Sequence, residues 1–169
     1  MEKIIRNFLE IKFLNELKHK KKPNSKYIVK KVSSEDFQLN KFFYKQIGKN
    51  HQWNDRLAWD DKKWINYVSN PNVFTFVLKD SEDIAGFFEL IYHKSKSEIE
   101  IAYFGLLTDY MDKKLGGYML TEAIKISFSY KIKRVWVHTC SFDHKNALNN
   151  YLARGMKIYN IETVSTKSA

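Results

Sequence analysis

The stretch that decides the fold is residues 98–156, EIEIAYFGLLTDYMDKKLGGYMLTEAIKISFSYKIKRVWVHTCSFDHKNALNNYLARGM. It predicts, in order, an apolar strand over 99–107, a basic turn ending in Gly116–Gly117, a helix over 118–130, a strand over 134–140 and a short helix that stops before Gly155. A strand feeding a glycine-bearing turn at the start of a helix points several backbone N–H groups at one place, at the positive end of the helix dipole. This segment therefore predicts a binding site for a diphosphate.

The same segment resembles the GNAT superfamily of acetyl-CoA-dependent N-acyltransferases, and the resemblance extends over roughly residues 25 to 162. It rests on an ordered series of words: YFGLL at 103–107, LGG at 115–117, RVWVHTC at 134–140, DH at 143–144, AL at 147–148, NY at 150–151 and RG at 154–155. The series is specific because chance rarely supplies all of its parts in order. The resemblance implies a bacterial, cytoplasmic enzyme with an α/β fold (an α+β mixed sheet) whose central strands part.

Composition narrows the class of protein. A chain of 169 residues with 44% hydrophobic residues fits one domain with a real core. It has no apolar run long enough for a membrane span, and Glu2, Arg6 and Glu10 argue against a secretory signal. The single cysteine, Cys140, fits a reducing compartment, and cysteine and histidine spacing predicts no metal site. The net charge of +10 fits either a polyanionic partner or a solvated, lysine-rich surface.

Along the chain we expect one domain over residues 23–169, preceded by a segment of its own over residues 1–22. The apolar spacing of that segment fits a helix or a strand, and the resemblance favours an added edge strand packed on the domain. The remaining pattern predicts the order β-α-α-β-β-β-α-β-α-β, in which hairpin-linked strands are followed by a right-handed crossover. No second domain or internal repeat is evident.

The resemblance also implies how acetyl-CoA binds. The family's diphosphate turn aligns with Met111-Asp112-Lys113-Lys114-Leu115-Gly116, followed by Gly117. Lys114 stands where the family has a glycine, and we expect it to fit only with a negative φ. The pantetheine arm is expected between the strands at 101–107 and 135–139, where it bonds to main chain as an added strand would. The residues assigned to this cofactor site are Phe104, Leu106, Leu107, residues 111–117 and Asn146.

For catalysis the resemblance assigns Tyr151 as the acid that protonates the departing thiolate. The alternative is a core tyrosine whose hydroxyl is tied to backbone. A base must accept the proton of the amine. Glu100 is the first candidate, because strand alternation places Glu98, Glu100, Ala102 and Phe104 on one face. Glu89, set in an apolar run, is the second candidate, and water is the third.

The acceptor site is predicted in the loop between the first two helices. Trp53 is expected to stack on or cover a substrate, and either Arg56 binds a carboxylate through two hydrogen bonds or Asp55 instead holds an amine. The alternative is structural: Trp53 and Trp59 fill the edge of the domain, and Asp55 pairs with Arg56. His138, at the end of a strand, is a further candidate for orienting the substrate. These residues favour a small or amino-acid-like amine as the acceptor.

Three functions follow from these patterns. The first is an N-acetyltransferase that moves an acetyl group from acetyl-CoA directly to a primary amine. The second is a catalytically silent acyl-CoA-binding module, which the departures at Met111 and Lys114 keep open. The third is a basic nucleic-acid-binding module, although the words of the common RNA-binding modules are missing. A homodimer is left open.

Overall fold

The computed structural model describes residues 2–33 and 36–165. Among them, seven strands form one sheet in the order β2-β3-β4-β5-β6-β1-β7. The strands are β1 (Lys3–Ile11), β2 (Tyr27–Lys31), β3 (Val73–Asp80), β4 (Asp83–His93), β5 (Glu98–Leu106), β6 (Arg134–Cys140) and β7 (Lys157–Ser165). The α-helices are α1 (Phe37–Gly48), α2 (Asp61–Val68), α3 (Leu115–Phe128) and α4 (Ala147–Ala153). This is the mixed α/β fold and the element order that the sequence predicts.

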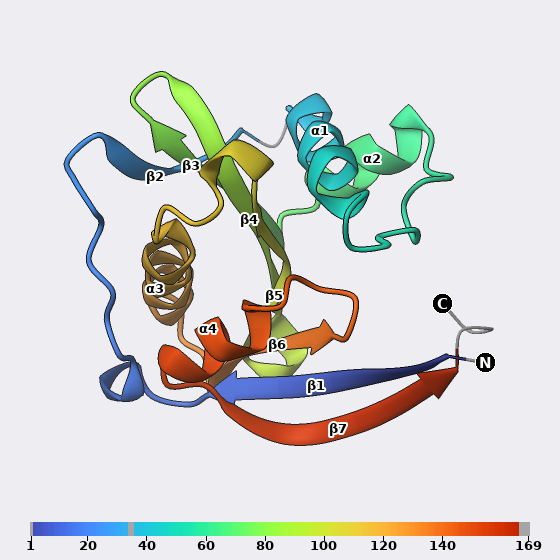
Figure 1. Cartoon of the computed structure of the whole chain (residues 1–169). Coiled ribbons are helices and arrows are strands. Elements are labelled where there is room, and N and C mark those ends of the chain that lie inside the picture. Colours follow the sequence, from blue (N-terminus) through green and yellow to red (C-terminus); the bar gives the residue numbers. More distant parts are fainter. Residues whose placement is uncertain (1, 34–35, 166–169) are drawn as a thin grey trace.

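Helices cover both faces of the sheet, with α3 and α4 on one side and α1 and α2 on the other (Figure 1). The larger core lies under α3 and α4 and includes Leu90, Ile101, Leu120 and Val135. A smaller core lies under α1, where the rings of Phe43 and Phe87 stack with centroids 4.8 Å apart. The middle of the sheet is thus buried on both faces, by α3 and α4 on one and by α1 and α2 on the other.

The N-terminal segment forms a strand, but its predicted place at the edge of the sheet is wrong. β1 lies between β6 and β7 and pairs antiparallel with both. Leu9 and Ile11 stand opposite Val137 and Val135 and are buried in the larger core. These apolar residues gain more burial inside the sheet than they would at an edge. The edge position goes to β7, whose residues are almost all exposed.

A β-bulge in β5 overturns the predicted faces of that strand. Glu89 pairs with Tyr103 and Leu90 with Ile101, so Ala102 is the extra residue. Beyond it the alternation is shifted. Phe104 packs against the larger core together with Ile101, and Tyr103 turns to the α1 side. Glu100 and Phe104 therefore do not share a face, because one inserted residue inverts every later side chain.

The two central parallel strands part, as the sequence predicts. β5 and β6 pair only at their first residues, Glu98 with Arg134, Ile99 with Val135 and Glu100 with Trp136. Beyond these pairs the two strands do not pair with each other over Ala102 to Leu106 of β5 and Val137 to Cys140 of β6. The result is a slot that opens toward the carboxyl ends of both strands.

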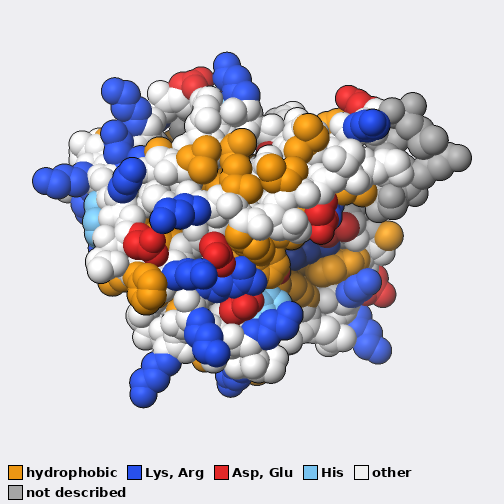
Figure 2. Space-filling view, turned by 90° about the horizontal axis from the view of Figure 1, so that it is seen from below, with side chains coloured by type: hydrophobic (Ala, Val, Ile, Leu, Met, Phe, Trp, Pro, Cys, Tyr) orange, Lys and Arg blue, Asp and Glu red, His pale blue; other side chains and the backbone are white. Residues whose placement is uncertain are grey.

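Figure 2 looks at the side of the molecule formed by β1 and β7, with Lys and Arg scattered among carboxylates and apolar side chains. They do not gather into one stripe on this face. The helices that the structure describes are all too short or too polar to cross a lipid bilayer.

Candidate functional site

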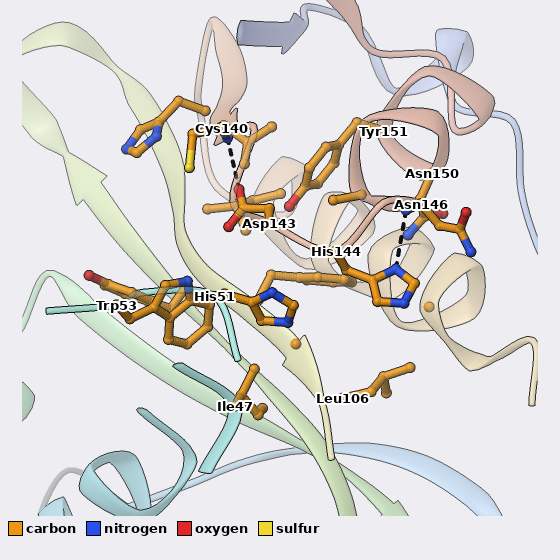
Figure 3. A pocket seen from close by; sticks show the side chains of 18 of the residues that line it. Ile47, His51, Trp53, Leu106, Cys140, Asp143, His144, Asn146, Asn150 and Tyr151 are labelled. Atoms are coloured by element: carbon orange, nitrogen blue, oxygen red, sulfur yellow. Dashed lines mark hydrogen bonds between the residues drawn. The ribbon is translucent and has the colours of Figure 1, made fainter. Parts of the chain in front are cut away.

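A cavity of about 1060 Å³ occupies the slot between β5 and β6 and continues to the loop between α1 and α2. Four regions of the chain line it: the turn at the start of α3, the parted strands, the β6–α4 loop with α4, and the acceptor loop with the first strand. Figure 3 shows residues from several of them around one space, with Leu106 of β5 on one side, Tyr151 and Asn150 of α4 above, and Trp53 of the acceptor loop opposite. One hollow therefore joins the predicted cofactor and acceptor sites.

The turn before α3 offers unpaired backbone donors. α3 begins at Leu115, and its N-cap Lys114 makes no capping bond with its side chain. The first N–H groups of an α-helix lack partners within the helix. Lys114 has φ +60°, so the expected negative φ is wrong: this lysine adopts the left-handed conformation that favours glycine. Backbone strain here, shared with Asp112 at φ +62°, aims the turn at the cavity.

Most residues assigned to the cofactor site line the cavity. They are Phe104, Leu106, Met111, Asp112, Lys114, Leu115, Gly116, Gly117 and Asn146. Lys113 and Leu107 do not. The Leu107 N–H already donates to the carbonyl of Ala85 at 2.8 Å, so it is not a free main-chain donor. The exposed edge of β5 for an added strand therefore ends before Leu107.

Tyr151 is held by α4 over the slot. Its side chain is 6% exposed, and its ring packs against Phe104 with centroids 6.2 Å apart. The hydroxyl makes no hydrogen bond to any residue of the described chain, so the tied, structural alternative finds no support there. Burial, aided by the charge of Asp143, raises the pKa of Tyr151 above its ordinary value. The phenol thus keeps its proton at neutral pH and presents it to the cavity (Figure 3).

Glu100 lies on the floor of the cavity, beside a histidine. Its Oε1 is 3.5 Å from Nε2 of His93, an ion-pair distance at which the two groups are not aligned as a hydrogen bond. Burial raises the pKa of Glu100, and His93 works against this by favouring the carboxylate. A carboxylate with a raised pKa that faces a cavity is suited to accept a proton.

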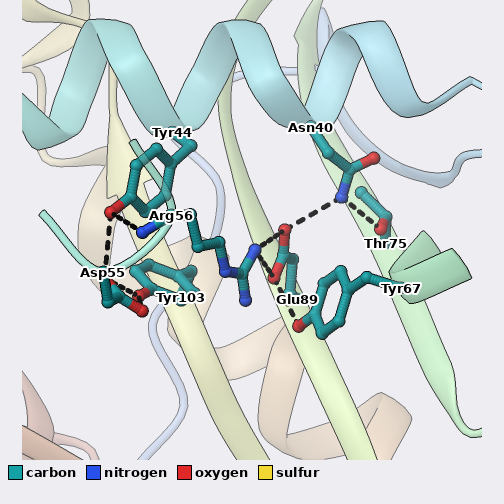
Figure 4. A network of polar contacts seen from close by, with 8 residues as sticks. All are labelled: Asn40, Tyr44, Asp55, Arg56, Tyr67, Thr75, Glu89 and Tyr103. Atoms are coloured by element: carbon teal, nitrogen blue, oxygen red, sulfur yellow. Dashed lines mark hydrogen bonds and ion pairs between the residues drawn. The ribbon is translucent and has the colours of Figure 1, made fainter. Parts of the chain in front are cut away.

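Glu89 does not face the cavity. It is completely buried and accepts hydrogen bonds from Asn40 at 2.9 Å and Tyr67 at 2.8 Å, while Nη1 of Arg56 reaches both of its oxygens at 3.1 and 3.0 Å. Figure 4 shows these groups meeting on β4 beneath α1. Every oxygen of Glu89 is already bonded, which argues against Glu89 as a base. The cation that balances the buried Glu89 carboxylate is the guanidinium of Arg56.

The same pairing changes the part given to Arg56. Its guanidinium is 5% exposed and is bonded to Glu89, with the ring of Tyr67 4.1 Å and the ring of Tyr103 4.2 Å from its central carbon. Arg56 touches the cavity wall but holds a carboxylate of the protein itself. The sequence could not reveal this, because Arg56 and Glu89 lie 33 residues apart.

The acceptor loop wraps the open side of the cavity. Trp53 packs against Tyr103 with ring centroids 4.7 Å apart, and a side chain on Gly48 would collide with it, since an ideal Cβ there lies 2.7 Å from Trp53 Cβ. Asp55 accepts hydrogen bonds from the hydroxyls of Tyr44 at 2.9 Å and Tyr103 at 2.7 Å. The predicted wall residues Trp53 and Asp55 thus line the cavity, with Asp55 held by two phenols.

A contact between two loops spans the cavity, and Asp143 supports one of these loops. Nδ1 of His51 lies 3.2 Å from the carbonyl oxygen of Phe142, so the α1–α2 loop touches the β6–α4 loop across the cavity. Asp143 accepts from Thr139 Oγ1 at 2.6 Å and from the Cys140 N–H at 2.9 Å, which fixes the end of β6. His51 was missed in the sequence because a lone loop histidine carries no periodic signal.

His138 lines the cavity on the α1 side of the sheet, where its ring lies 5.5 Å from that of Phe8. Burial, with Arg6 nearby, lowers the pKa of His138 and favours the neutral ring. Burial raises the pKa of Cys140, so the thiol is a poor nucleophile. Arg6 of β1 also lines the cavity and was missed, since its place depends on where β1 enters the sheet.

No group of three or more His, Cys, Asp or Glu suited to a metal ion occurs within residues 2–33 and 36–165.

The structure thus combines a mixed sheet whose parallel strands part, a helix N-terminus at the slot and a phenol above it. A family model described as the acetyltransferase (GNAT) family matches residues 34–156, and the chain belongs to that family. The resemblance read from residues 98–156 is thereby confirmed at the level of the superfamily. A comparison with curated proteins finds none that matches by sequence.

Solved structures share the fold at low identity. An aminoglycoside acetyltransferase from an uncultured soil metagenomic sample, in complex with trehalose, has a TM-score of 0.64 at 14% identity over 76% of this chain and 87% of its own. A GCN5-related N-acetyltransferase from Sphaerobacter thermophilus has a TM-score of 0.71 at 12% identity over 95% of this chain and 50% of its own. A PaiA N-acetyltransferase from Thermoplasma acidophilum, in complex with coenzyme A, has a TM-score of 0.50 at 20% identity over 62% of this chain and 74% of its own. At these identities the likeness shows the fold alone.

Proposed function

We propose that this protein is an N-acetyltransferase that moves an acetyl group from acetyl-CoA directly to a primary amine of a small or amino-acid-like molecule. The observation that carries the proposal is the slot between β5 and β6, which runs from the α3 turn to a free tyrosine hydroxyl. Family membership supports acyl transfer as the reaction. The geometry of the slot supports acetyl-CoA as the acetyl donor and direct transfer to the amine.

The residues of the slot fit acetyl-CoA. The unpaired N–H groups at Leu115 to Gly117 suit a diphosphate, and Lys114 adds a positive charge beside them. The main chain of β5 from Ala102 to Leu106, which is unpaired on the side that faces β6, suits the amides of the pantetheine arm. An ideal Cβ on Gly116 would meet only Asn150 Nδ2, at 3.4 Å, so the space in front of this turn is open.

The chemistry then falls to two side chains. Acetyl-CoA supplies the activated acetyl thioester. Glu100 accepts the proton that the attacking amine must lose, directly or through water, and its raised pKa suits this exchange near neutral pH. Tyr151 gives its hydroxyl proton to the departing sulfur, which avoids release of a free thiolate. No acyl-enzyme is needed, in accord with the raised pKa of Cys140.

The test is calorimetry with acetyl-CoA, followed by a panel of primary amines in an assay for released thiol. We expect binding and turnover with at least one amine. Binding without turnover across the panel would favour the silent acyl-CoA-binding module. A salt-steep affinity for DNA or RNA, with no binding of acetyl-CoA, would favour the nucleic-acid module.

Gly116→Val examines the turn itself. The valine side chain has room in the free protein but fills the space in front of the N–H groups, so acetyl-CoA binding should be abolished while the fold persists. Lys125→Val is the matched control, because it places the same β-branched residue at an exposed position of α3. Tight binding by Gly116→Val would mean that the diphosphate site lies elsewhere.

A further inference from the structure

Arg6 places a positive charge in the acceptor half of the cavity. It stands on β1 opposite Cys140 of β6, with Glu162 of β7 on its other side. Leu9 and Ile11 of β1 face the core under α3, so Arg6 and Phe8, of opposite parity, face the α1 side. The ring of Phe8 lies beside His138 on this face. Arg6 is therefore across the sheet from the turn that suits the diphosphate.

Arg6 differs from Arg56 and Arg134 in having no carboxylate partner. Among the described residues Arg154 also pairs with no carboxylate, but Arg154 does not line the cavity. Arg56 is paired with Glu89 at 3.0 Å, and Arg134 is paired with Glu10 at 2.8 Å and Glu98 at 3.0 Å. Within the described chain the Arg6 side chain makes no ion pair and no hydrogen bond, and its Nε is buried without a partner. A guanidinium nitrogen that is buried without an acceptor costs free energy, and Arg6 lines the cavity, so its side chain is suited to an acceptor that a ligand brings there.

The acidic groups in the acceptor half of the cavity are engaged with other partners, and Asp112 lies in the other half, at the turn before α3. Asp55 is held by Tyr44 and Tyr103, Asp143 by the end of β6, and Glu100 lies beside His93. Glu162 is the strand neighbour of Arg6, but the two do not form an ion pair. The neutral form of His138 adds no competing charge. The acceptor half thus holds one guanidinium whose hydrogen-bonding capacity is unused.

We infer that Arg6 binds the carboxylate of the acceptor, so that the substrate is an amino acid or a similar amine carrying a carboxylate. A planar guanidinium matches a carboxylate through two parallel hydrogen bonds. Neighbouring strands lie about 4.8 Å apart, so a group on β1 is one strand away from the slot at β6, a span that fits an amine and a carboxylate on one small molecule. The inference rests on the proposed function and names its substrate class.

Arg6 lies outside the part of the chain that matches the family model. The family model covers residues 34–156, and Arg6 precedes them. The specificity element comes from a strand inserted between β6 and β7, while the transfer machinery comes from the matched region.

The experiment compares α-amino acids with their own carboxamides as acceptors, at saturating acetyl-CoA, in the wild type, Arg6→Gln and Arg6→Lys. We expect the wild type to prefer the acids by about 10- to 100-fold in kcat/KM, the usual range for a charge-assisted hydrogen-bonded pair. Arg6→Gln should bring the ratio of acid to amide close to one, mainly through a higher KM for the acids. Arg6→Lys should retain part of the preference. Lys3→Gln is the control, since it removes one positive charge from an exposed position of the same strand.

Equal use of acids and amides by the wild type would overturn the inference. So would an Arg6→Gln variant that keeps the wild-type ratio. If acetyl-CoA binds but no amine is acetylated, the proposed function fails by itself. The carboxylate site is then decided by calorimetry of amino acids on the CoA-loaded protein: affinity that drops about tenfold or more in Arg6→Gln upholds it, and equal or undetectable affinity rejects it.

Discussion

Two carboxylates on the same side of the sheet differ in what surrounds them. Glu89 of β4 lies in a closed polar cluster with Arg56, Asn40 and Tyr67, and it does not line the cavity. Glu100 of β5 has one partner, His93 at 3.5 Å, and opens onto the cavity. Both residues are charged groups in apolar strands, and the sequence pattern does not separate them. Their partners do.

The difference has a physical origin. A buried charge is tolerated when its partners satisfy it fully, and removing one partner then exposes the whole cost of burial. Glu89 meets that condition and so supports the fold and the acceptor loop that carries Arg56. Glu100 retains capacity for another proton or another partner, which is the property that chemistry requires. The comparison predicts opposite effects for changes at the two sites.

The largest expected effect is on stability, in the closed cluster. Glu89→Leu leaves the Arg56 guanidinium buried without its carboxylate and should lower the free energy of unfolding by about 3–5 kcal/mol. Urea denaturation of the two proteins measures the difference. Glu122→Gln is the control, because Glu122 pairs with Lys125 on the surface of α3 and its loss should cost less than about 1 kcal/mol. Equal stability of Glu89→Leu and the wild type would mean that the cluster is not structural.

The next largest effect is expected on turnover, at the residues that line the cavity. Tyr151→Phe removes the proton donor but keeps the ring that packs on Phe104, so turnover should fall on the order of 100-fold while acetyl-CoA affinity changes little. Steady-state kinetics and calorimetry separate the two quantities. Tyr130→Phe is the matched control, since Tyr130 stacks on Phe74 away from the cavity. An unchanged rate in Tyr151→Phe removes this residue as the acid.

The elements of the fold were largely predictable because their signals are local. The helix that becomes α1, the hairpin of β3 and β4, and β6 from Arg134 to Cys140 all follow from periodicity and turn residues. The parted strands came from the resemblance to the family. The position of Tyr151 over the slot follows once α4 is placed after β6.

What the sequence could not supply depends on contacts between distant segments. The bulge at Ala102 leaves no mark on the alternation of EIEIAYF, yet it moves Phe104 to the other face. The pairing of Arg56 with Glu89 joins two regions that look independent in the sequence. The insertion of β1 between β6 and β7 puts Arg6 in the cavity, and an edge strand would not have done so.

A smaller effect, on the pH dependence of the rate, distinguishes Glu100 from water as the base. If Glu100 is the base, the rate falls as pH drops through its pKa, which burial has raised, so the acidic limb lies above the ordinary range of a glutamate. Glu100→Gln should flatten this limb and lower the rate at neutral pH by about 10- to 100-fold. The pH dependence of kcat/KM is the measurement.

His93 and Arg56 are the groups that act on the pKa of Glu100, and His93 lies beside its carboxylate. His93→Asn separates the two neighbours, since it removes the imidazole and leaves the carboxylate. A limb that persists in His93→Asn and disappears in Glu100→Gln assigns the base to Glu100. A limb unchanged in both variants gives the role to water.

The smallest effect concerns the strained turn. The left-handed conformation costs a residue with a side chain about 1 kcal/mol, and glycine adopts it freely. Lys114→Gly should therefore raise the free energy of unfolding by about 0.5–1 kcal/mol, whereas Lys113→Gly, at a position without positive φ, should lower it by a similar amount. Lys114→Gln keeps the strain and removes only the charge. If acetyl-CoA affinity drops equally in Lys114→Gly and Lys114→Gln, the charge of the lysine explains its place in a turn that favours glycine; if only the glycine variant loses affinity, the held shape of the turn does.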